Sequence, residues 1–234
     1  MIRASQNLPE RVRVLRERIA AAAARAGRNV ADITLLAVSK AQPAESVRAA
    51  AALGVADFGE SYLNEALGKV EALETLRLTW HFVGRVQANK TRPIAERFQW
   101  VHGLERLHIA ERLAAQRPVH APPLNVCIQV NLAGEQSKAG VAPEALPALA
   151  AAIGPLPQLR LRGLMCIPPA ETDPARQRAW FARLRELRDA LNAQGALLDT
   201  LSMGMSEDFE SAILEGATMV RIGTALFGPR APPA

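Results

Sequence analysis

Apolar and polar residues alternate in blocks along the chain, and this pattern predicts the secondary structure. Short, mostly apolar runs recur from residue 33 onwards, and most are followed by a segment whose apolar residues have helical spacing. Such runs, bounded by turn residues, are typical of buried strands. We therefore predict eight strands, over residues 33–40, 55–61, 80–84, 100–105, 124–132, 161–168, 200–205 and 219–227.

Two of the predicted helices have clear limits. The first precedes all the strands, with Pro9 near its start and Gly27 at its end. Its apolar positions are Val12, Leu15 and Ile19. A later helix has Asp173 and Pro174 as start signals, and its apolar positions are Trp180, Leu184, Leu187 and Leu191.

The alternation of strands and helices predicts the fold. Such alternation implies parallel pairing of the strands through right-handed crossovers. Eight units in roughly 200 residues suit a closed (β/α)8 TIM-type barrel with an additional N-terminal helix. An open doubly wound sheet is the competing α/β architecture, but no G-x-G-x-x-G motif follows the first strand. No linker divides the chain, so we expect residues 1–234 to form a single domain.

The composition is that of an ordinary globular protein. Hydrophobic residues make up 49% and charged residues 22% of the 234 positions, which excludes a disordered chain. No apolar run approaches the roughly 20 residues that span a bilayer, and the N-terminal segment lacks the apolar stretch of a signal peptide. The two cysteines are too few for a disulfide framework or a cysteine-based zinc site. We therefore expect a reduced, cytoplasmic protein without a membrane partner.

The net charge of +5 is a weak indication of a nucleic-acid partner. The excess comes from arginines that lie among acidic residues, as on solvated helix faces, and there are only four lysines. Aromatic residues make up 4% of the chain, and none is interleaved with a basic block. The sequence thus argues against specific binding of nucleic acids.

Lys40 is the first candidate for chemistry. In a barrel of this kind the site lies at the C-terminal ends of the strands, and the first predicted strand ends in this lysine. Partial burial at such a position lowers the pKa of a lysine and makes the neutral amine accessible. A neutral amine condenses with an aldehyde to form a Schiff base. The alternative is a solvated lysine that only closes the strand.

The last two strands end in residues suited to an anion. Residues 200–206 read Thr-Leu-Ser-Met-Gly-Met-Ser, and Ser206 is a candidate N-cap for a following helix. The next strand supplies Arg221 and a Gly223-Thr224 turn. Loops after strands seven and eight often bind phosphate in these barrels, because glycine lets backbone N–H groups approach an anion and hydroxyls add donors.

These features together predict a ligand with an aldehyde at one end and a phosphate at the other. Pyridoxal 5′-phosphate has both groups. A sugar phosphate bound by a Schiff-base aldolase would also fit, so this chemistry leaves the two open.

Other polar residues are weaker candidates. A histidine on a strand, such as His81, more often lies in the core or in a hydrogen bond than in a site. Glu60 and Ser61 end the second predicted strand. Cys127 and Cys166 are expected to be buried. The remaining histidines lack metal-ligand spacing; they are His102, His108 and His120.

Several short motifs occur in a characteristic order. The chain resembles the pyridoxal phosphate homeostasis protein family, also called the YggS/PROSC family, from about residue 8 to residue 230. The motifs that carry the resemblance are Leu-Leu-Ala-Val-Ser-Lys40, Phe58-Gly-Glu, Trp80-His-Phe-Val-Gly84, Gln87-Ala-Asn-Lys90, Ser137-Lys-Ala-Gly140, Arg162-Gly-Leu-Met165, Ser202-Met-Gly-Met-Ser206 and Val220-Arg-Ile-Gly-Thr-Ala-Leu-Phe-Gly228.

The resemblance implies roles for particular residues. That family is similar in fold to the N-terminal barrel of alanine racemase. By this resemblance Lys40 is the Schiff-base lysine of pyridoxal 5′-phosphate. Ser202, Gly223 and Thr224 would hold the phosphate, with Ser206 beside them.

Four further positions follow from the same resemblance. Arg221 would face the pyridine nitrogen and keep it unprotonated, which weakens the ring as an electron sink. Lys138 matches a second lysine of the family. Ser61 departs from the family, which usually has asparagine there. Racemisation needs a second acid/base group, which alanine racemase draws from a C-terminal domain that we expect to be missing here. Tyr62 is the single tyrosine of the sequence.

The resemblance therefore implies a cofactor carrier and regulator rather than an enzyme. It would act in intracellular vitamin B6 and amino-acid homeostasis, without established turnover. It would be a monomer, with apoenzymes that require pyridoxal phosphate as candidate recipients. A racemase-like enzyme and a Schiff-base aldolase are the alternatives.

Overall fold

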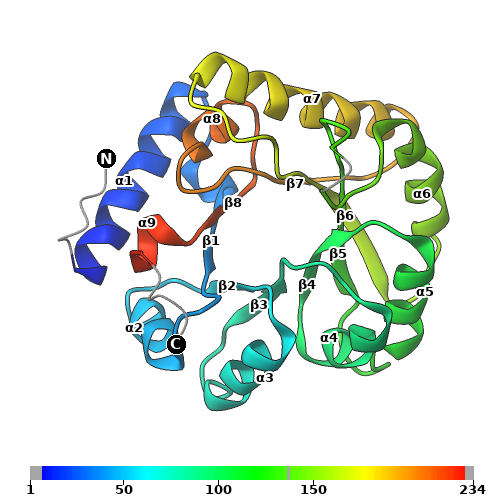
Figure 1. The fold of residues 1–234 in the computed structure, drawn as a ribbon, viewed down its shortest axis with the longest axis horizontal. Coiled ribbons are helices and arrows are strands. Elements are labelled where there is room, and N and C mark those ends of the chain that lie inside the picture. The colour runs from blue at the N-terminus through cyan, green and yellow to red at the C-terminus, as the bar shows by residue number, and fades with distance from the viewer. Residues whose placement is uncertain (1–6, 136–137, 230–234) are drawn as a thin grey trace.

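Eight parallel strands form a closed barrel in the computed structural model, which describes residues 7–135 and 138–229. Each strand pairs with the next along the sequence, and the first pairs with the last. The predicted (β/α)8 architecture is therefore confirmed (Figure 1). The strands are β1 (Thr34–Val38), β2 (Asp57–Glu60), β3 (Thr79–Phe82), β4 (Trp100–Leu104), β5 (Leu124–Gln129), β6 (Leu159–Met165), β7 (Thr200–Ser202) and β8 (Met219–Ile222).

Helices surround the barrel and pack their apolar faces against its outer surface (Figure 1). No helix among the described residues is long and apolar enough to cross a membrane. The α-helices are α1 (Leu8–Arg25), α2 (Ala44–Ala52), α3 (Leu63–Ala72), α4 (Thr91–Arg97), α5 (Leu107–Gln116), α6 (Leu146–Ile153), α7 (Pro174–Ala193), α8 (Phe209–Leu214) and α9 (Thr224–Phe227). Short 3₁₀ turns are η1 (Val30–Asp32), η2 (Ala88–Lys90) and η3 (Pro143–Ala145).

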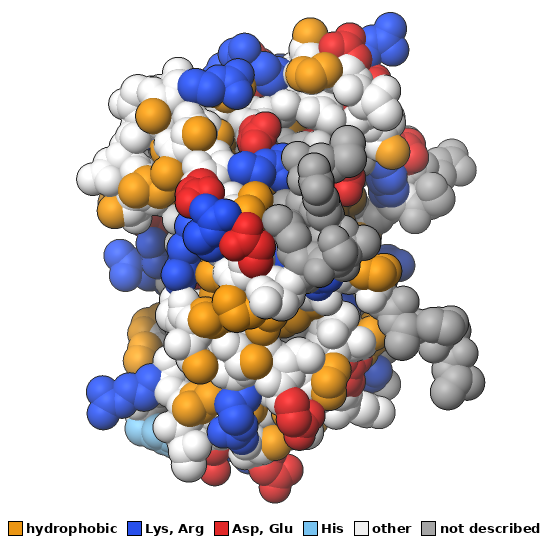
Figure 2. All heavy atoms as spheres, turned by 90° about the vertical axis from the view of Figure 1, so that its left-hand side faces the viewer, with side chains coloured by type: hydrophobic (Ala, Val, Ile, Leu, Met, Phe, Trp, Pro, Cys, Tyr) orange, Lys and Arg blue, Asp and Glu red, His pale blue; other side chains and the backbone are white. Residues whose placement is uncertain are grey.

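The additional N-terminal helix, α1, has the limits that its sequence predicts. The Asn7 side chain accepts a hydrogen bond from the Glu10 N–H at 3.1 Å, and Pro9 lies in the first turn. The helix packs against α8 and α9. On its exposed face Arg13 pairs with Glu10 and Glu17. Acidic and basic side chains lie next to one another over this side of the molecule (Figure 2), which is the mixed surface expected from the charge pattern.

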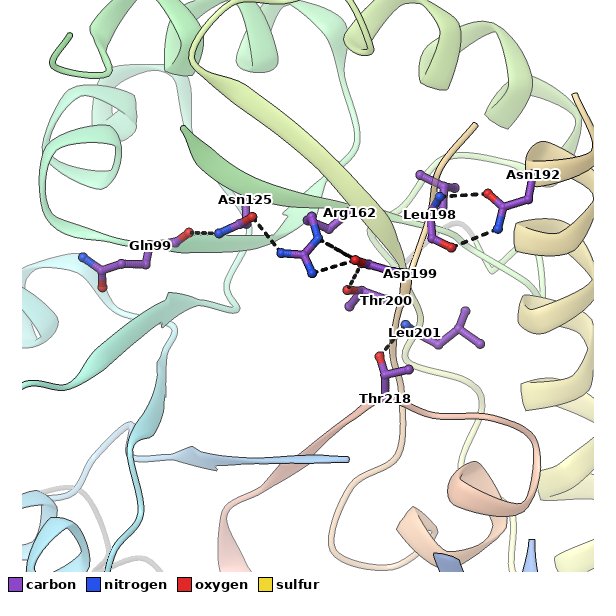
Figure 3. A network of polar contacts seen from close by, with 9 residues as sticks. All are labelled: Gln99, Asn125, Arg162, Asn192, Leu198, Asp199, Thr200, Leu201 and Thr218. Atoms are coloured by element: carbon purple, nitrogen blue, oxygen red, sulfur yellow. Dashed lines mark hydrogen bonds and ion pairs between the residues drawn. The ribbon is translucent and has the colours of Figure 1, made fainter. Parts of the chain in front are cut away.

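A polar cluster lies at the N-terminal end of the barrel (Figure 3). Arg162 makes a two-point contact with the Asp199 carboxylate, at 2.9 and 2.7 Å, and also donates to Asn125. Its guanidinium lies 5.0 Å from the centre of the Trp100 ring. These contacts lie at the end of the barrel opposite to the expected site.

Two predicted elements near the C-terminus are wrong. The strand predicted over 219–227 ends at Ile222, and Thr224–Phe227 form a helical turn because the N–H groups of Leu226 and Phe227 donate to the Gly223 carbonyl. Ser206 is not a helix N-cap, since α8 begins three residues later at Phe209.

Candidate functional site

A cavity of about 940 Å³ opens at the C-terminal ends of the strands. Five of the six predicted site residues line it: Lys40, Ser206, Arg221, Gly223 and Thr224. They converge because Arg221 lies near the C-terminal end of its strand and the other four lie beyond the ends of theirs, in one closed barrel. Its other lining residues are Val38, Ser61, Val83, Lys138, Ile167, Pro168, Pro169, Ala170, Glu171, Thr172, Gln177, Met205, Glu207 and Asp208.

Lys40 lies two residues beyond β1, at the turn that leads into α2. Ser39 before it is fully buried and donates its N–H to the Gly59 carbonyl at 2.9 Å. Ala41 after it has a φ of +59°, in the left-handed region that residues other than glycine rarely adopt. The lysine is therefore carried by a tightly fixed turn at the rim of the barrel.

The loops after β7 and β8 are tied to each other in the part of the cavity wall next to β1, since β8 pairs with β1. The Ala225 N–H donates to the Ser206 hydroxyl at 3.2 Å. The Met205 N–H donates to the Asp208 carboxylate at 2.6 Å. Gly223 and Thr224 lie at the start of α9, where the first N–H groups of a helix have no acceptor within it. This wall offers backbone and hydroxyl donors suited to an anion.

Arg221 forms part of the cavity wall but is 95% buried, since its relative exposure is 5%. Its guanidinium donates to the Ser202 carbonyl at 2.5 Å and to the Cys166 carbonyl at 2.8 Å. Burial lowers the pKa of Arg221, and these main-chain acceptors offset the loss of water around the guanidinium. Arg221 is a fixed cation.

Ser202 does not line the cavity, unlike the other five predicted residues. Its hydroxyl is fully buried, accepts a hydrogen bond from Arg221 at 2.9 Å and lies 2.7 Å from the Nδ1 atom of His102. It supports Arg221 from the interior of the barrel. The two cysteines are also fully buried, and burial raises the pKa of each thiol to about 12.

A chain of buried side chains continues from Ser202 through the barrel. The Nε2 atom of His102 lies 3.0 Å from Nδ1 of His81, and Nε2 of His81 lies 3.0 Å from the Asp57 carboxylate. Asp57, at the start of β2, is partly exposed. His81 is therefore a hydrogen-bonded residue of the barrel interior, as expected from its place on a strand.

All hydrogen bonds in this series of side chains, from Arg221 to Asp57, have the same direction. The Asp57 carboxylate can only accept, so His81 donates from Nε2. Burial lowers the pKa of both histidines, well below the usual value for His102. Because neutral His81 then accepts at Nδ1, His102 donates from Nε2 and accepts at Nδ1 from the Ser202 hydroxyl. Arg221 donates to Ser202 at the other end.

The two buried histidines make the stability of the protein depend on pH. The unfolded chain takes up protons below about pH 6.5, whereas the folded histidines stay neutral to lower pH, so stability falls as the pH falls. One such histidine accounts for about 1.4 kcal/mol between roughly pH 7.5 and 5.5. Between these two pH values, we expect the free energy of unfolding of His102→Gln to fall by about 1.4 kcal/mol less than that of the parent. Urea denaturation at each pH measures it.

His108 provides the control for this measurement. It lies exposed on α5, and His108→Gln is expected to leave the difference between the two pH values unchanged. The raised pKa of Glu60, which results from burial, acts with the opposite sign, so only the comparison of variants isolates the histidine. An unchanged pH dependence in His102→Gln would show that this histidine does not carry the effect.

The sequence did not single out the acidic part of the cavity wall. Glu171, Glu207 and Asp208 come from the loops after β6 and β7. The signals were present in the Pro168-Pro169 loop and in the Glu-Asp pair after Ser206. Burial raises the pKa of Asp208, even though it accepts the Met205 N–H.

Two residues named from the family resemblance also line the cavity. Ser61 follows β2, and Lys138 lies in the loop after β5. Lys138 forms an ion pair with Glu135 at 2.8 Å. The Gly140 N–H, two residues further on, donates to the Glu105 carboxylate at 2.7 Å. The neighbouring Ser137 of the same motif lies outside the described residues.

Comparisons with known proteins give consistent results across almost the whole chain. Residues 12–231 match the alanine racemase N-terminal domain family. A pyridoxal phosphate homeostasis protein of Pseudomonas aeruginosa is 61% identical over 223 residues, which cover 95% of this chain and 96% of that protein. The protein of the same name from Escherichia coli K12 is 48% identical over 219 residues, which cover 92% and 94%.

Solved structures agree with these matches. PipY of Synechococcus elongatus, in a structure with pyridoxal phosphate bound, is 37% identical, with a TM-score of 0.84 over 95% of this chain and 100% of that chain. Alanine racemase of Corynebacterium glutamicum is 17% identical, with a TM-score of 0.68 over 92% and 60%. At that identity the likeness concerns the fold alone.

Proposed function

Because this chain belongs to the pyridoxal phosphate homeostasis protein family, we propose that it binds pyridoxal 5′-phosphate and acts in vitamin B6 and amino-acid homeostasis. One observation carries the proposal. A single cavity is lined both by Lys40, which carries an amine, and by Gly223, Thr224 and Ser206, which offer donors for an anion. The PLP-bound structure of the relative PipY supports it.

The residues that line the cavity fit the two ends of this cofactor. Lys40 supplies a primary amine for the aldehyde, and Gly223 and Thr224 offer donors for the phosphate. Ser206 joins them through its contact with Ala225. We assign Ser202 a role different from that implied by the family resemblance, since its hydroxyl supports Arg221 instead of facing the cavity.

Arg221 decides how the bound ring would behave. Pyridoxal phosphate, when bound, supplies an aldehyde for a Schiff base and a ring that can withdraw electrons. A fixed guanidinium beside the pyridine nitrogen keeps that nitrogen unprotonated and weakens this withdrawal. The main-chain acceptors of Arg221 hold it as a donor in one orientation. We therefore propose that the protein holds the cofactor and does not use it for turnover.

The rest of the proposal concerns partners and setting. Tyr62, the single tyrosine, does not line the cavity, so it is not placed as the second acid/base group of a racemase. We propose that the protein is one domain and a cytoplasmic monomer, and that it passes cofactor to apoenzymes that require it. The two free, buried cysteines are compatible with a reducing compartment.

A spectrum and a reduction experiment test the cofactor assignment. The protein reconstituted with pyridoxal 5′-phosphate is expected to be yellow, because the amine of Lys40 forms a Schiff base with the aldehyde. Borohydride reduction followed by peptide mapping should place the pyridoxyl group on Lys40. Lys40→Ala should lose this absorbance and retain residual noncovalent binding through the phosphate contacts.

Three results would contradict the proposal. An adduct found only on Lys69 or Lys90 would exclude Lys40 as the attachment site. A colourless protein that cannot be reconstituted and that cleaves a ketose phosphate would be a Schiff-base aldolase. Racemisation of an amino acid by the reconstituted protein would contradict the absence of turnover.

A further inference from the structure

A buried ionic cluster lies directly behind the Lys40 turn, between the barrel and α3. The ammonium of Lys69 lies 2.7 Å from a Glu60 carboxylate oxygen and 2.5 Å from a Glu65 carboxylate oxygen. The Lys69 side chain is 6% exposed and that of Glu60 is fully buried. Burying an ion pair costs free energy because both charges lose their water. We therefore expect a pair at this position to have a role.

The cluster binds the main chain on both sides of Lys40. Lys69 donates to the carbonyl of Ser39 at 2.6 Å. The Glu65 carboxylate oxygen that pairs with Lys69 also accepts the N–H of Ala41 at 2.7 Å. The peptide groups before and after Lys40 are thus held by two side chains of one helix, α3.

Glu60 completes the cluster from the end of β2. One of its carboxylate oxygens accepts from both the Ser39 hydroxyl, at 2.6 Å, and the Lys69 ammonium. Burial raises the pKa of Glu60, and the hydrogen bonds from Lys69 and Ser39 act in the opposite direction. The other oxygen, Oε2, is buried without a hydrogen-bond partner. Glu60 therefore depends on Lys69 for its counter-charge.

The conformation that the cluster holds is one the chain rarely adopts alone. Ala41 has a φ of +59°, which is uncommon for a residue with a side chain. Such a conformation persists only where the surroundings determine it. The hydrogen bond from the Ala41 N–H to Glu65 holds this conformation at the residue that follows Lys40.

We propose that Lys69, Glu60 and Glu65 form a positioning cluster, which fixes the turn around Lys40 and directs its amine into the cavity before the cofactor binds. This inference rests on the proposed function. The step that it serves is addition of the amine to the cofactor aldehyde: a carbon–nitrogen double bond forms, and the aldehyde oxygen leaves as water. Holding the amine in place lowers the entropic cost of that step.

Glu65 offers the sharpest test because it lies at the edge of the cluster, with a side chain 31% exposed. Glu65→Ala removes the acceptor of the Ala41 N–H. Glu65→Gln keeps an oxygen in the same place and is the matched variant. Lys69→Met removes the central charge and leaves Glu60 without its cation, so we use it only as a supporting variant.

Each Glu65 variant is combined with Lys40 and with Lys40→Ala. Pyridoxal 5′-phosphate affinity is measured by equilibrium dialysis, and the rate of Schiff-base formation by absorbance. With Lys40 present, we expect Glu65→Ala to slow formation and weaken affinity by about 10-fold. Glu65→Gln should stay within about threefold of the parent. In the Lys40→Ala background, Glu65→Ala should leave the residual affinity unchanged.

The outcomes separate this inference from the proposed function. A parent protein that takes up no cofactor overturns the proposed function and this inference with it. A parent that binds, with Glu65→Ala equal to it in rate and affinity, overturns the inference alone. Equal weakening by Glu65→Ala in both backgrounds also overturns it, because the substitution then distorts the whole cavity instead of acting through Lys40.

Discussion

Replacing Gly223 with aspartate is expected to lower the affinity for pyridoxal 5′-phosphate by at least about 100-fold. The position lines the cavity, and an added Cβ would lie 3.4 Å from the Val38 carbonyl, an ordinary contact. The fold should therefore accept the side chain. The new carboxylate would stand where we place the phosphate. Hydrogen bonds to a charged group contribute about 1.5–3 kcal/mol each, so loss of two contacts already reaches that factor.

Gly223→Asn is the matched control, because asparagine has nearly the same shape as aspartate without the charge. We expect its affinity to lie between those of the parent and Gly223→Asp. Thr224→Val, which removes one hydroxyl donor, should have a smaller effect than either. Dialysis against the cofactor gives the dissociation constants, and thermal unfolding confirms that each variant is folded. Full retention of cofactor by Gly223→Asp would place the phosphate elsewhere.

The second large effect concerns stability. A Cβ added at Gly163 would lie 1.8 Å from the carbonyl oxygen of Thr200 and 2.6 Å from its carbon. These are backbone atoms of the neighbouring strand, with which Gly163 pairs, so they can move only if β6 and β7 separate. We expect Gly163→Ala to cost about 3 kcal/mol or more, at the upper end of overpacking. For a chain of this size the melting temperature should fall by roughly 6–12 °C.

Gly68→Ala adds the same methyl group where nothing lies within 4 Å, on the exposed side of α3. Alanine is the better helix former, so this variant should gain about 0.5–1 kcal/mol. Calorimetry of the two variants gives effects of opposite sign if the contact at Thr200 is responsible. A Gly163→Ala protein as stable as the parent would mean that β6 and β7 can move apart without loss of stability.

The sequence predicted the barrel because its strands are short, apolar and separated by strongly periodic helices. It also located most of the candidate site, since the ends of parallel strands in a closed barrel must converge. Lys40, Gly223 and Thr224 could be found by reading strand ends alone. The acidic residues of the wall were not found, because they lie further along their loops.

Two errors have identifiable physical causes. Thr-Ala-Leu-Phe is apolar and reads as a continuation of β8, but the backbone turns at Gly223 and the segment closes a helical turn. Ser202 and Ser206 belong to one motif, and a motif does not say which hydroxyl faces the cavity. Ser202 lies on β7 itself and points at Arg221, whereas Ser206 lies beyond the strand.

The contacts that the sequence could not reveal join residues far apart in the chain. Asp57 and His81 are 24 positions apart, and His102 and Ser202 are 100 apart. They come within hydrogen-bonding distance only because the barrel closes. Lys69 likewise appeared only as one lysine among four, because its partners lie just after β1, on β2 and on its own helix.

The polar chain from Arg221 to Asp57 limits how the barrel interior could be redesigned. Each side chain in it satisfies the next, so an apolar substitution at His102 leaves a buried donor or acceptor unpaired on both sides, and one at His81 leaves the buried Nε2 donor of His102 unpaired. An engineer who seeks a more stable core would have to replace the series as a set. The last member of the set is the hydroxyl that receives Arg221. Greater stability would then come at the expense of the fixed orientation of Arg221, the buried cation in the cavity wall.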